Sequence, residues 1–185
     1  MTAHSGSRWS EPFIVFPAFV LPKGYKAKTF FSDPHWLDDM GKAHRFLDEI
    51  VLGDLAFEAT GDSVSELFAT AALAVIEAMA DPLTVETNWT KTCLLSESEI
   101  EDLFFEWLNS IVFIKDAEGV VFHSVRAMVR HDSENNLWHL DATLTGDGVD
   151  ATRQDLRTDV KAVTKHLFEI RSNESGWYAR VVLDV

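Results

Sequence analysis

The residues whose types and spacing suggest chemistry lie at the end of the sequence. Segment 177–185 (WYARVVLDV) has the apolar character of a buried β-strand, and it ends with Asp184 and the α-carboxylate of Val185. Two carboxylates fixed side by side at a strand end are the start of a hard-cation site, because Ca²⁺ and Mg²⁺ prefer oxygen ligands. Such a site needs a third carboxylate from elsewhere in the chain.

Two further aspartates are candidates for that third ligand. Asp54 stands directly before a predicted strand of apolar and small residues, where a charge costs free energy unless it is paired or metal-bound. Asp159 opens a segment expected to form a hairpin with 177–185, which would bring it near Asp184. The same pairing is also common among carboxylates that bind nothing, so the residues alone leave both interpretations open.

The other reactive side chains carry weaker signals. The sequence has no glycine-rich phosphate loop, no GxSxG elbow, no HExxH motif and no EF-hand loop. Cys93 is the one cysteine, and it falls in a predicted strand, so we expect a core residue rather than a nucleophile. His166 lies on the apolar face of a predicted strand, and we expect it to be buried and hydrogen-bonded rather than a metal ligand.

Composition limits the classes of partner. The chain has 185 residues, 46% of them hydrophobic, and a formal net charge of −14. An acidic surface repels phosphate backbones, so we expect no direct nucleic-acid binding; it suits cations or a basic partner protein, unless the acidity serves only solubility. No apolar run is long enough to cross a membrane and no signal-peptide pattern is present, so we expect no membrane association and a cytoplasmic protein.

Residues 1–44 differ from the rest of the sequence. They combine four prolines with seven phenylalanine and tryptophan residues, and proline at that density prevents long helices while the aromatics argue against full disorder. We therefore expect a Pro- and aromatic-rich N-terminal extension over 1–44, packed on the domain or on a partner, and a single regular domain over 45–185.

Two helices are predicted in that domain. Ser63 and Glu66 form a capping box in front of apolar residues at helical spacing, which predicts a helix over 64–80. A second pair at the same spacing, Ser96 and Glu99, is expected to open the next helix.

Strands and loops fill the remainder. Segment 159–170 has residues that favour a helix, but its alternation and the turn after it favour a strand in a hairpin. The order strand, helix, strand, helix and then several strands indicates an α+β domain, with two helices packed on a mostly antiparallel β-sheet. Strands are expected at 55–59, 84–94, 120–130, 137–145, 159–170 and 177–185, with a loop at 145–148.

Several segments resemble the archease family, over residues 46–185. Segment 158–166 is similar to the family's T-E-V-K-A-x-T strand and 180–185 to its Leu-Asp-Val ending, which is the most specific part of the likeness. The matching segments are 57–61 (FEATG), 65–73 (SELFATAAL), 102–109 (DLFFEWLN), 118–122 (EGVVF), 158–166 (TDVKAVTKH), 176–177 (GW) and 180–185 (RVVLDV).

The resemblance implies a function. Archeases are protein cofactors, not enzymes, of the RNA ligase that joins 2′,3′-cyclic-phosphate or 3′-phosphate ends to 5′-hydroxyl ends. They promote guanylylation and turnover of that ligase in tRNA splicing and RNA repair. They also bind a divalent cation, calcium in known examples, with Mg²⁺ as the alternative here.

The resemblance also implies which residues would act. The cation ligands carried over are Asp54, Asp184 and Val185, the last through its terminal carboxylate. Asp159 and Arg153 match an acidic and a basic residue implicated in activating the ligase.

One departure from the family pattern bears on the partner. Where archeases have His-Thr-Ala-Asp, this chain has Val51, Leu52, glycine and Asp54, so the motif's histidine and threonine are lost. An archease-fold chaperone or interaction module for a different enzyme therefore stays open. A separate alternative is a hydrolase that uses Asp54, Asp159 and Asp184 as a two-metal cluster.

Overall fold

The computed structural model describes residues 44–47 and 54–185. The extension predicted over 1–44, apart from its last residue, and the departures at Val51 and Leu52 lie outside the described residues. In the part that is described, no helix is long and apolar enough to cross a membrane.

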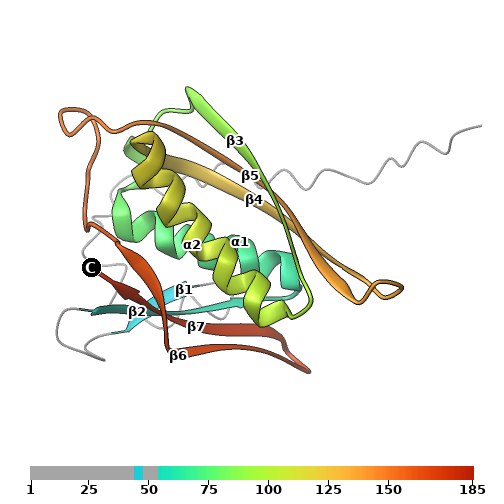
Figure 1. Ribbon diagram of the computed structural model, residues 1–185. Coiled ribbons are helices and arrows are strands. Elements are labelled where there is room, and N and C mark those ends of the chain that lie inside the picture. Colours follow the sequence, from blue (N-terminus) through green and yellow to red (C-terminus); the bar gives the residue numbers. More distant parts are fainter. Residues whose placement is uncertain (1–43, 48–53) are drawn as a thin grey trace, which may run out of the picture. The chain divides into compact units, whose positions relative to one another are not determined.

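Two helices lie between two antiparallel sheets (Figure 1). The helices are α1 (Val64–Met79) and α2 (Ile100–Glu118), and a short 3₁₀ helix, η3 (Pro82–Thr84), follows α1. One sheet has the order β1-β2-β7-β6, with β1 (His44–Leu47), β2 (Asp54–Gly61), β7 (Gly176–Asp184) and β6 (Ala162–Asn173). The other has the order β3-β5-β4, with β3 (Trp89–Glu97), β5 (Leu137–Gly148) and β4 (Val120–Asp132). The predicted α+β class is confirmed, with the strands divided between two sheets.

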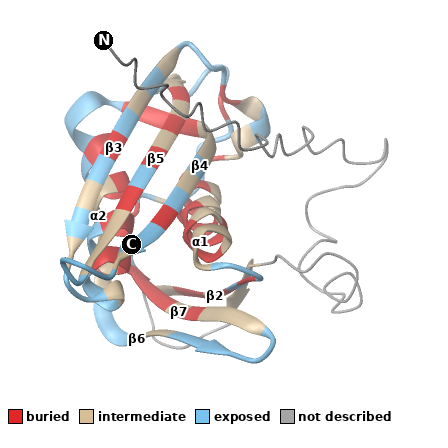
Figure 2. Ribbon diagram, turned by 90° about the vertical axis from the view of Figure 1, so that its right-hand side faces the viewer, coloured by how far each residue is buried: buried red, intermediate tan, exposed pale blue. Residues whose placement is uncertain are grey.

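The core lies where the helices meet the sheets. Phe68 and Phe104 bring their ring centroids to 4.9 Å across the helix pair, and both side chains are fully buried. Trp107 is also fully buried, and its indole N–H donates to the Phe68 carbonyl at 3.2 Å, so its one polar atom is satisfied. Each such side chain stabilises the fold by roughly 1.5–3 kcal/mol. Figure 2 shows the buried residues gathered along both helices and the middle of the strands.

The first capping box is confirmed. Ser63 Oγ accepts from the Glu66 N–H at 3.2 Å, and the Glu66 carboxylate accepts from the Asp62 N–H at 3.0 Å. These bonds satisfy two N–H groups that have no partner inside the helix. The helix ends at Met79, one residue before the predicted end.

The prediction of a second capping box, at Ser96 and Glu99, is wrong. Ser96 belongs to β3, and its hydroxyl lies 2.7 Å from His139 Nδ1 on the neighbouring strand. The residue that caps α2 is Glu99, which makes no side-chain capping bond. Pairing of β3 with β5 continues through Glu97. Ser96 therefore stays in the strand and cannot cap the helix, although its spacing from Glu99 is that of a capping box. The start predicted for this strand, residue 84, falls in η3 instead, and β3 begins at Trp89.

The C-terminal hairpin is confirmed, with its turn between Asn173 and Gly176, but two details differ. The strand β6 begins at Ala162, so Asp159 precedes the strand rather than opening it. A register shift follows Thr164, and within it Leu167 adopts a positive φ of 54°. The bulge breaks the alternation of faces, so His166 is exposed and the prediction of a buried histidine is wrong.

Residues 145–148 form the end of β5 and not the expected loop. Gly146 is the reason that the strand can continue there, because a Cβ at this position would collide with the carbonyl oxygen of Val121. The facing strand carries a register shift between Phe122 and Ser124, so the two backbones approach closely where only glycine fits.

In each sheet, the backbone of an edge strand is bonded by a polar side chain of a helix. Ser65 on α1 accepts from the Val129 N–H at 2.8 Å and lies 3.3 Å from the Val129 carbonyl oxygen. Asn109 on α2 accepts from the Val163 N–H at 3.1 Å. Both bonds satisfy backbone groups that an edge strand leaves unpaired.

We expect Ser65→Ala to lower the free energy of unfolding by about 1–3 kcal/mol, because it leaves two backbone groups of Val129 without their partner. Urea unfolding followed by circular dichroism measures the change. Ser98→Ala, at an exposed serine before α2, is the matched control and should be nearly neutral. Equal effects of the two substitutions would contradict this account of the edge strand.

Candidate functional site

The strand register brings Asp54 and Asp184 together. They are direct partners in the antiparallel pair β2–β7, at the end of both strands. Directly opposite residues project from the same face of a sheet with their Cβ atoms about 4.5–5.5 Å apart. Like charges in that position destabilise a sheet, so this arrangement costs free energy unless a cation lies between the two carboxylates. The pair is therefore suited to holding one.

Val185, the residue that follows Asp184, is held in place by packing and by the pairing of its neighbour. Val185 packs its side chain against the hydrophobic core, and Leu183, two residues earlier, is fully buried. The Lys161 N–H donates to the Asp184 carbonyl oxygen at 2.9 Å, which continues the pairing along the β6 side. The backbone at Asp184 is thus held between two neighbours, and the α-carboxylate of Val185 leaves from a fixed point.

The donor set fits a hard cation. Over residues 44–47 and 54–185, no group of three or more His, Cys, Asp or Glu side chains could hold a metal ion. The side chains of Asp54 and Asp184 supply two carboxylates, and within the part of the chain that the structure describes, the α-carboxylate of Val185 is the candidate for a third anionic donor. Carboxylate oxygens without thiolate or imidazole suit Ca²⁺ or Mg²⁺ rather than zinc or copper.

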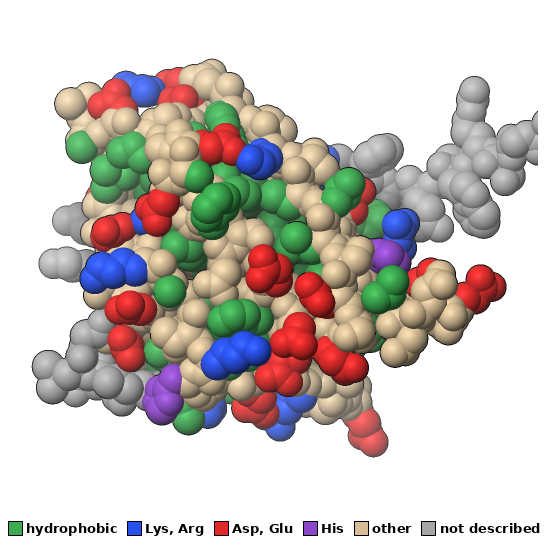
Figure 3. All heavy atoms as spheres, viewed as in Figure 1, with side chains coloured by type: hydrophobic (Ala, Val, Ile, Leu, Met, Phe, Trp, Pro, Cys, Tyr) green, Lys and Arg blue, Asp and Glu red, His purple; other side chains and the backbone are tan. Residues whose placement is uncertain are grey.

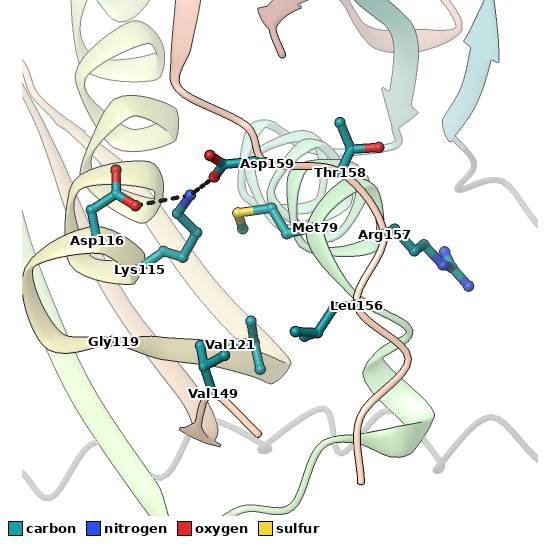
Figure 4. A pocket seen from close by; sticks show the side chains of 10 residues that line it. All are labelled: Met79, Lys115, Asp116, Gly119, Val121, Val149, Leu156, Arg157, Thr158 and Asp159. Carbon is teal, nitrogen blue, oxygen red and sulfur yellow. Dashed lines mark hydrogen bonds and ion pairs between the residues drawn. The ribbon is translucent and has the colours of Figure 1, made fainter. Parts of the chain in front are cut away.

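Asp159 has a different partner from the one that its sequence position suggested. Its carboxylate accepts a hydrogen bond of 2.6 Å from Nζ of Lys115, near the end of α2 (Figure 4). Lys115 also pairs with Asp116 at 2.9 Å and donates to the Val160 carbonyl at 3.1 Å. Burial by itself would lower the pKa of the Lys115 ammonium, but the hydrogen bonds to the two carboxylates raise it. The bond from Lys115 lowers the pKa of Asp159 in turn.

Arg153 pairs with carboxylates of its own connecting segment, of β5 and of the residues after η3. Its guanidinium lies 2.7 Å from Asp150, 3.2 Å from Asp147 and 3.4 Å from Glu86. Hydrogen bonds from Thr152 and Arg153 lower the pKa of Asp150 to about 2. The arginine and Asp159 stand six residues apart in the segment that connects β5 to β6, and each is held by a separate set of partners.

That connecting segment, residues 149–161, covers the C-terminal ends of both helices. At α1, the Arg157 and Thr158 N–H groups donate to the carbonyls of Met79 and Ala78 at 2.8 and 3.0 Å. At α2, the Val149 N–H donates to the Gly119 carbonyl at 2.9 Å. The last carbonyls of a helix have no partner inside it, so these bonds fix the segment on the domain.

Sequence reasoning missed Lys115 and the network around Glu58. A lone lysine in the last turn of an apolar helix is compatible with the helix dipole alone, so its sequence carries no signal for a buried ion pair. Glu58 lies on the same face of β2 as Asp54, opposite Arg45 on one side and Arg180 on the other. The signal in the sequence that could have identified Glu58 is its charge in the middle of an otherwise apolar strand.

The carboxylate of Glu58 accepts bonds from three side chains. Arg45, Arg180 and Tyr178 donate to it at 2.7, 2.8 and 2.7 Å, and its side chain is only 13% exposed. Burial would raise the pKa of Glu58, but these hydrogen bonds outweigh it and lower the pKa to about 2. The network joins β1, β2 and β7 across the face that carries Asp54 and Asp184.

Comparison with known proteins gives one consistent result. Residues 44–185 match the profile of the Archease protein family (MTH1598/TM1083). The protein archease of Methanothermobacter thermautotrophicus is 33% identical over 144 residues, 78% of this chain and 99% of that protein. The archease of Methanosarcina barkeri is 28% identical over 149 residues, 80% of this chain and all of that protein.

Two solved structures have the same fold. The solution structure of protein 1598 of Methanobacterium thermoautotrophicum matches with a TM-score of 0.65 at 31% identity, covering 77% of this chain and 99% of that one. The crystal structure of an archease from Thermotoga maritima, described as a possible chaperone, matches with a TM-score of 0.50 at 20% identity. It covers 75% of this chain and 98% of that one, and at this identity it supports the fold alone.

We expect Glu58→Gln to lower the free energy of unfolding at pH 7 by roughly 1–3 kcal/mol, because it removes charge-assisted hydrogen bonds. A carboxylate with a lowered folded-state pKa stabilises fully above its ordinary value, near 4.5, and loses that contribution as pH falls toward 2. The difference in the free energy of unfolding between wild type and variant, measured by urea unfolding, should therefore become smaller as the pH falls from 4.5 to 2. Glu134→Gln, at an exposed turn, is the control; a gap that is independent of pH would contradict the role given to Glu58.

Proposed function

This chain belongs to the archease family, and from that premise we propose that it is a divalent-cation-binding protein cofactor of an RNA ligase. The ligase would be the enzyme that joins 2′,3′-cyclic-phosphate or 3′-phosphate ends to 5′-hydroxyl ends in tRNA splicing or RNA repair. The protein would promote its guanylylation and turnover without catalysing a reaction itself. The observation that carries the proposal is the direct pairing of Asp54 with Asp184 at the end of β2 and β7.

The proposed cation is Ca²⁺, with Mg²⁺ as the alternative. Asp54 and Asp184 would contribute side-chain oxygens, and Val185 would contribute its α-carboxylate. Bound there, the ion would supply positive charge that offsets the repulsion between the two aspartates and would keep coordination positions for oxygen atoms of water or of a partner. Ca²⁺ tolerates the irregular geometry of such a set better than Mg²⁺, which demands near-ideal octahedral coordination.

The charge of the chain supports action on the ligase rather than on RNA. The formal net charge is −14, and acidic side chains gather over the N-terminal half of α2 in the space-filling view (Figure 3). A surface of this sign repels a phosphate backbone and attracts a basic protein surface. Asp159 and Arg153, the two residues that the family resemblance links to activation, would act through contact with the ligase.

A chaperone or interaction module for a different enzyme is the second candidate. The observation that favours it is the replacement of the family's histidine and threonine by Val51 and Leu52 next to Asp54. A hydrolase built on Asp54, Asp159 and Asp184 has less support, because the Asp159 carboxylate is engaged by Lys115.

We expect Ca²⁺ to raise the melting temperature of the protein, since a ligand that binds only the folded state stabilises it by about 2.7 kcal/mol at 100 times its Kd. Asp184→Asn should abolish that shift. Without any cation, the same variant should melt at or slightly above the wild-type temperature, because it removes a like-charge contact. Calorimetry with and without Ca²⁺ measures both effects.

Two controls separate the cation site from general acidity. Asp141→Asn, at an exposed aspartate of β5, should keep the full Ca²⁺ shift. Deleting Val185 should remove the shift by moving the α-carboxylate, whereas Val185→Ala retains that group and should retain the shift. A deletion variant that responds like wild type would eliminate the α-carboxylate as a ligand.

We expect the wild-type protein to increase the rate at which the purified ligase is guanylylated by GTP, and Asp184→Asn to lose most of that increase. The assay follows transfer of labelled guanylate to the ligase, with Asp141→Asn as the matched control. No effect of wild type on the ligase, together with intact Ca²⁺ binding, would favour the chaperone or interaction module over the ligase cofactor.

A further inference from the structure

A pocket of about 380 Å³ opens between the C-terminal ends of the two helices and the segment that connects β5 to β6 (Figure 4). Four apolar residues line it: Met79, Val121, Val149 and Leu156. Val149 and Leu156 come from the connecting segment and remain 50% and 37% exposed. Apolar side chains that stay exposed around a hollow are typical of a surface that binds a partner.

The connecting segment holds these apolar residues in place. Leu156 lies between residues whose backbones bond to the end of α1: the Asp155 carbonyl accepts from the Asp81 N–H at 2.9 Å, and the Arg157 N–H donates to Met79. The Val149 N–H is bonded to the end of α2. Because these bonds fix the backbone of the segment on the domain, the pocket is already formed in the free protein.

The rim of the pocket carries an excess of negative charge. One ammonium, that of Lys115, is shared by the carboxylates of Asp116 and Asp159. The lysine side chain is 10% exposed, whereas those of Asp116 and Asp159 are 62% and 77% exposed. Both carboxylates therefore present free oxygens to solvent over an apolar floor, with one compensating charge behind them.

The remaining cation of the lining does not neutralise this rim. The guanidinium of Arg157 points away from the apolar residues (Figure 4). It donates to the Glu77 carbonyl at 2.9 Å and lies 3.6 Å from the Asp81 carboxylate. The rim formed by Lys115, Asp116 and Asp159 keeps a net charge of about −1, in a chain whose formal net charge is −14.

We propose that this pocket docks a basic segment of the partner protein, in which an aliphatic side chain stands next to an arginine or lysine. The aliphatic group lies against Val149 and Leu156, and the cationic group bonds to Asp116 and Asp159. Charge complementarity selects this occupant: an acidic segment would meet two carboxylates of its own sign, and an uncharged apolar one would leave them without a partner. The choice of the ligase as that partner rests on the proposed function.

The pocket is a different surface from the cation site but lies close to it in the chain. Asp159 is two residues before Lys161, whose N–H bonds to the Asp184 carbonyl. A partner seated over Asp159 would therefore reach the end of β7, while the cation ligands themselves remain outside the pocket lining. Binding of the segment and binding of the cation can be separated by mutation.

The test uses the full chain and measures the Kd for the purified ligase. Leu156→Asp replaces an apolar contact by a third carboxylate and should weaken binding about ten-fold or more, as for a residue at the centre of an interface. Asp116→Asn should weaken binding less and reduce its dependence on salt. Leu94→Asp, at a residue 71% exposed on β3, is the matched control and should bind like wild type.

The binding results test the docking proposal and the proposed function separately. The Leu156→Asp variant should keep the wild-type Ca²⁺ shift in melting temperature, which shows that it folds; if it does not fold, Val149→Asp takes its place. Wild-type affinity in the variants overturns the docking proposal and leaves the proposed function intact. Failure of the wild-type protein itself to bind the ligase overturns the proposed function, and the choice of this partner with it.

Discussion

The position of β7 in the middle of its sheet is the constraint on which the rest of the structure depends. It pairs with β2 on one side and β6 on the other, and its core residues Val181 and Leu183 are fully buried. Because the side-chain period of a strand is two, a slip of one residue in this pairing would turn the apolar residues outward. The same register puts Asp54 opposite Asp184, so the packing of the core fixes the geometry of the candidate cation site.

The segment between β5 and β6 has a structural and a chemical role at once. Its backbone satisfies carbonyl groups at the ends of both helices, and this requirement is general to helices that end inside a domain. The segment is thereby held in a fixed course that presents Asp159 and Leu156 at the surface. Lys115 secures the same course from α2 through two carboxylates and the Val160 carbonyl. Loss of that lysine would leave two carboxylates beside each other without their shared cation.

Local patterns predicted the elements well and their contacts less well. The capping box at Ser63 is correct because nothing competes with it, whereas the equivalent pattern at Ser96 loses to a strand ladder that continues past it. The pairing of β6 with β7 followed from alternation, but the bulge after Thr164 did not, so the side of the sheet on which His166 lies was misassigned. Asp54 and Asp184 stood out in the sequence because each adjoins an apolar strand. The partner of Asp159 lies on a helix 44 residues away, and no short pattern encodes such a contact.

The central place of β7 also sets an order of events during synthesis. The ribosome delivers β1, β2 and both helices before β7, and a two-stranded ribbon is marginally stable in water. Until β7 emerges, the side of α1 that faces this sheet has only a partial cover, and the nascent chain exposes apolar residues such as Phe57 that the finished domain buries. Pairing between strands so distant in sequence is slow. The nascent domain therefore passes through a period in which residues of its future core are exposed to solvent.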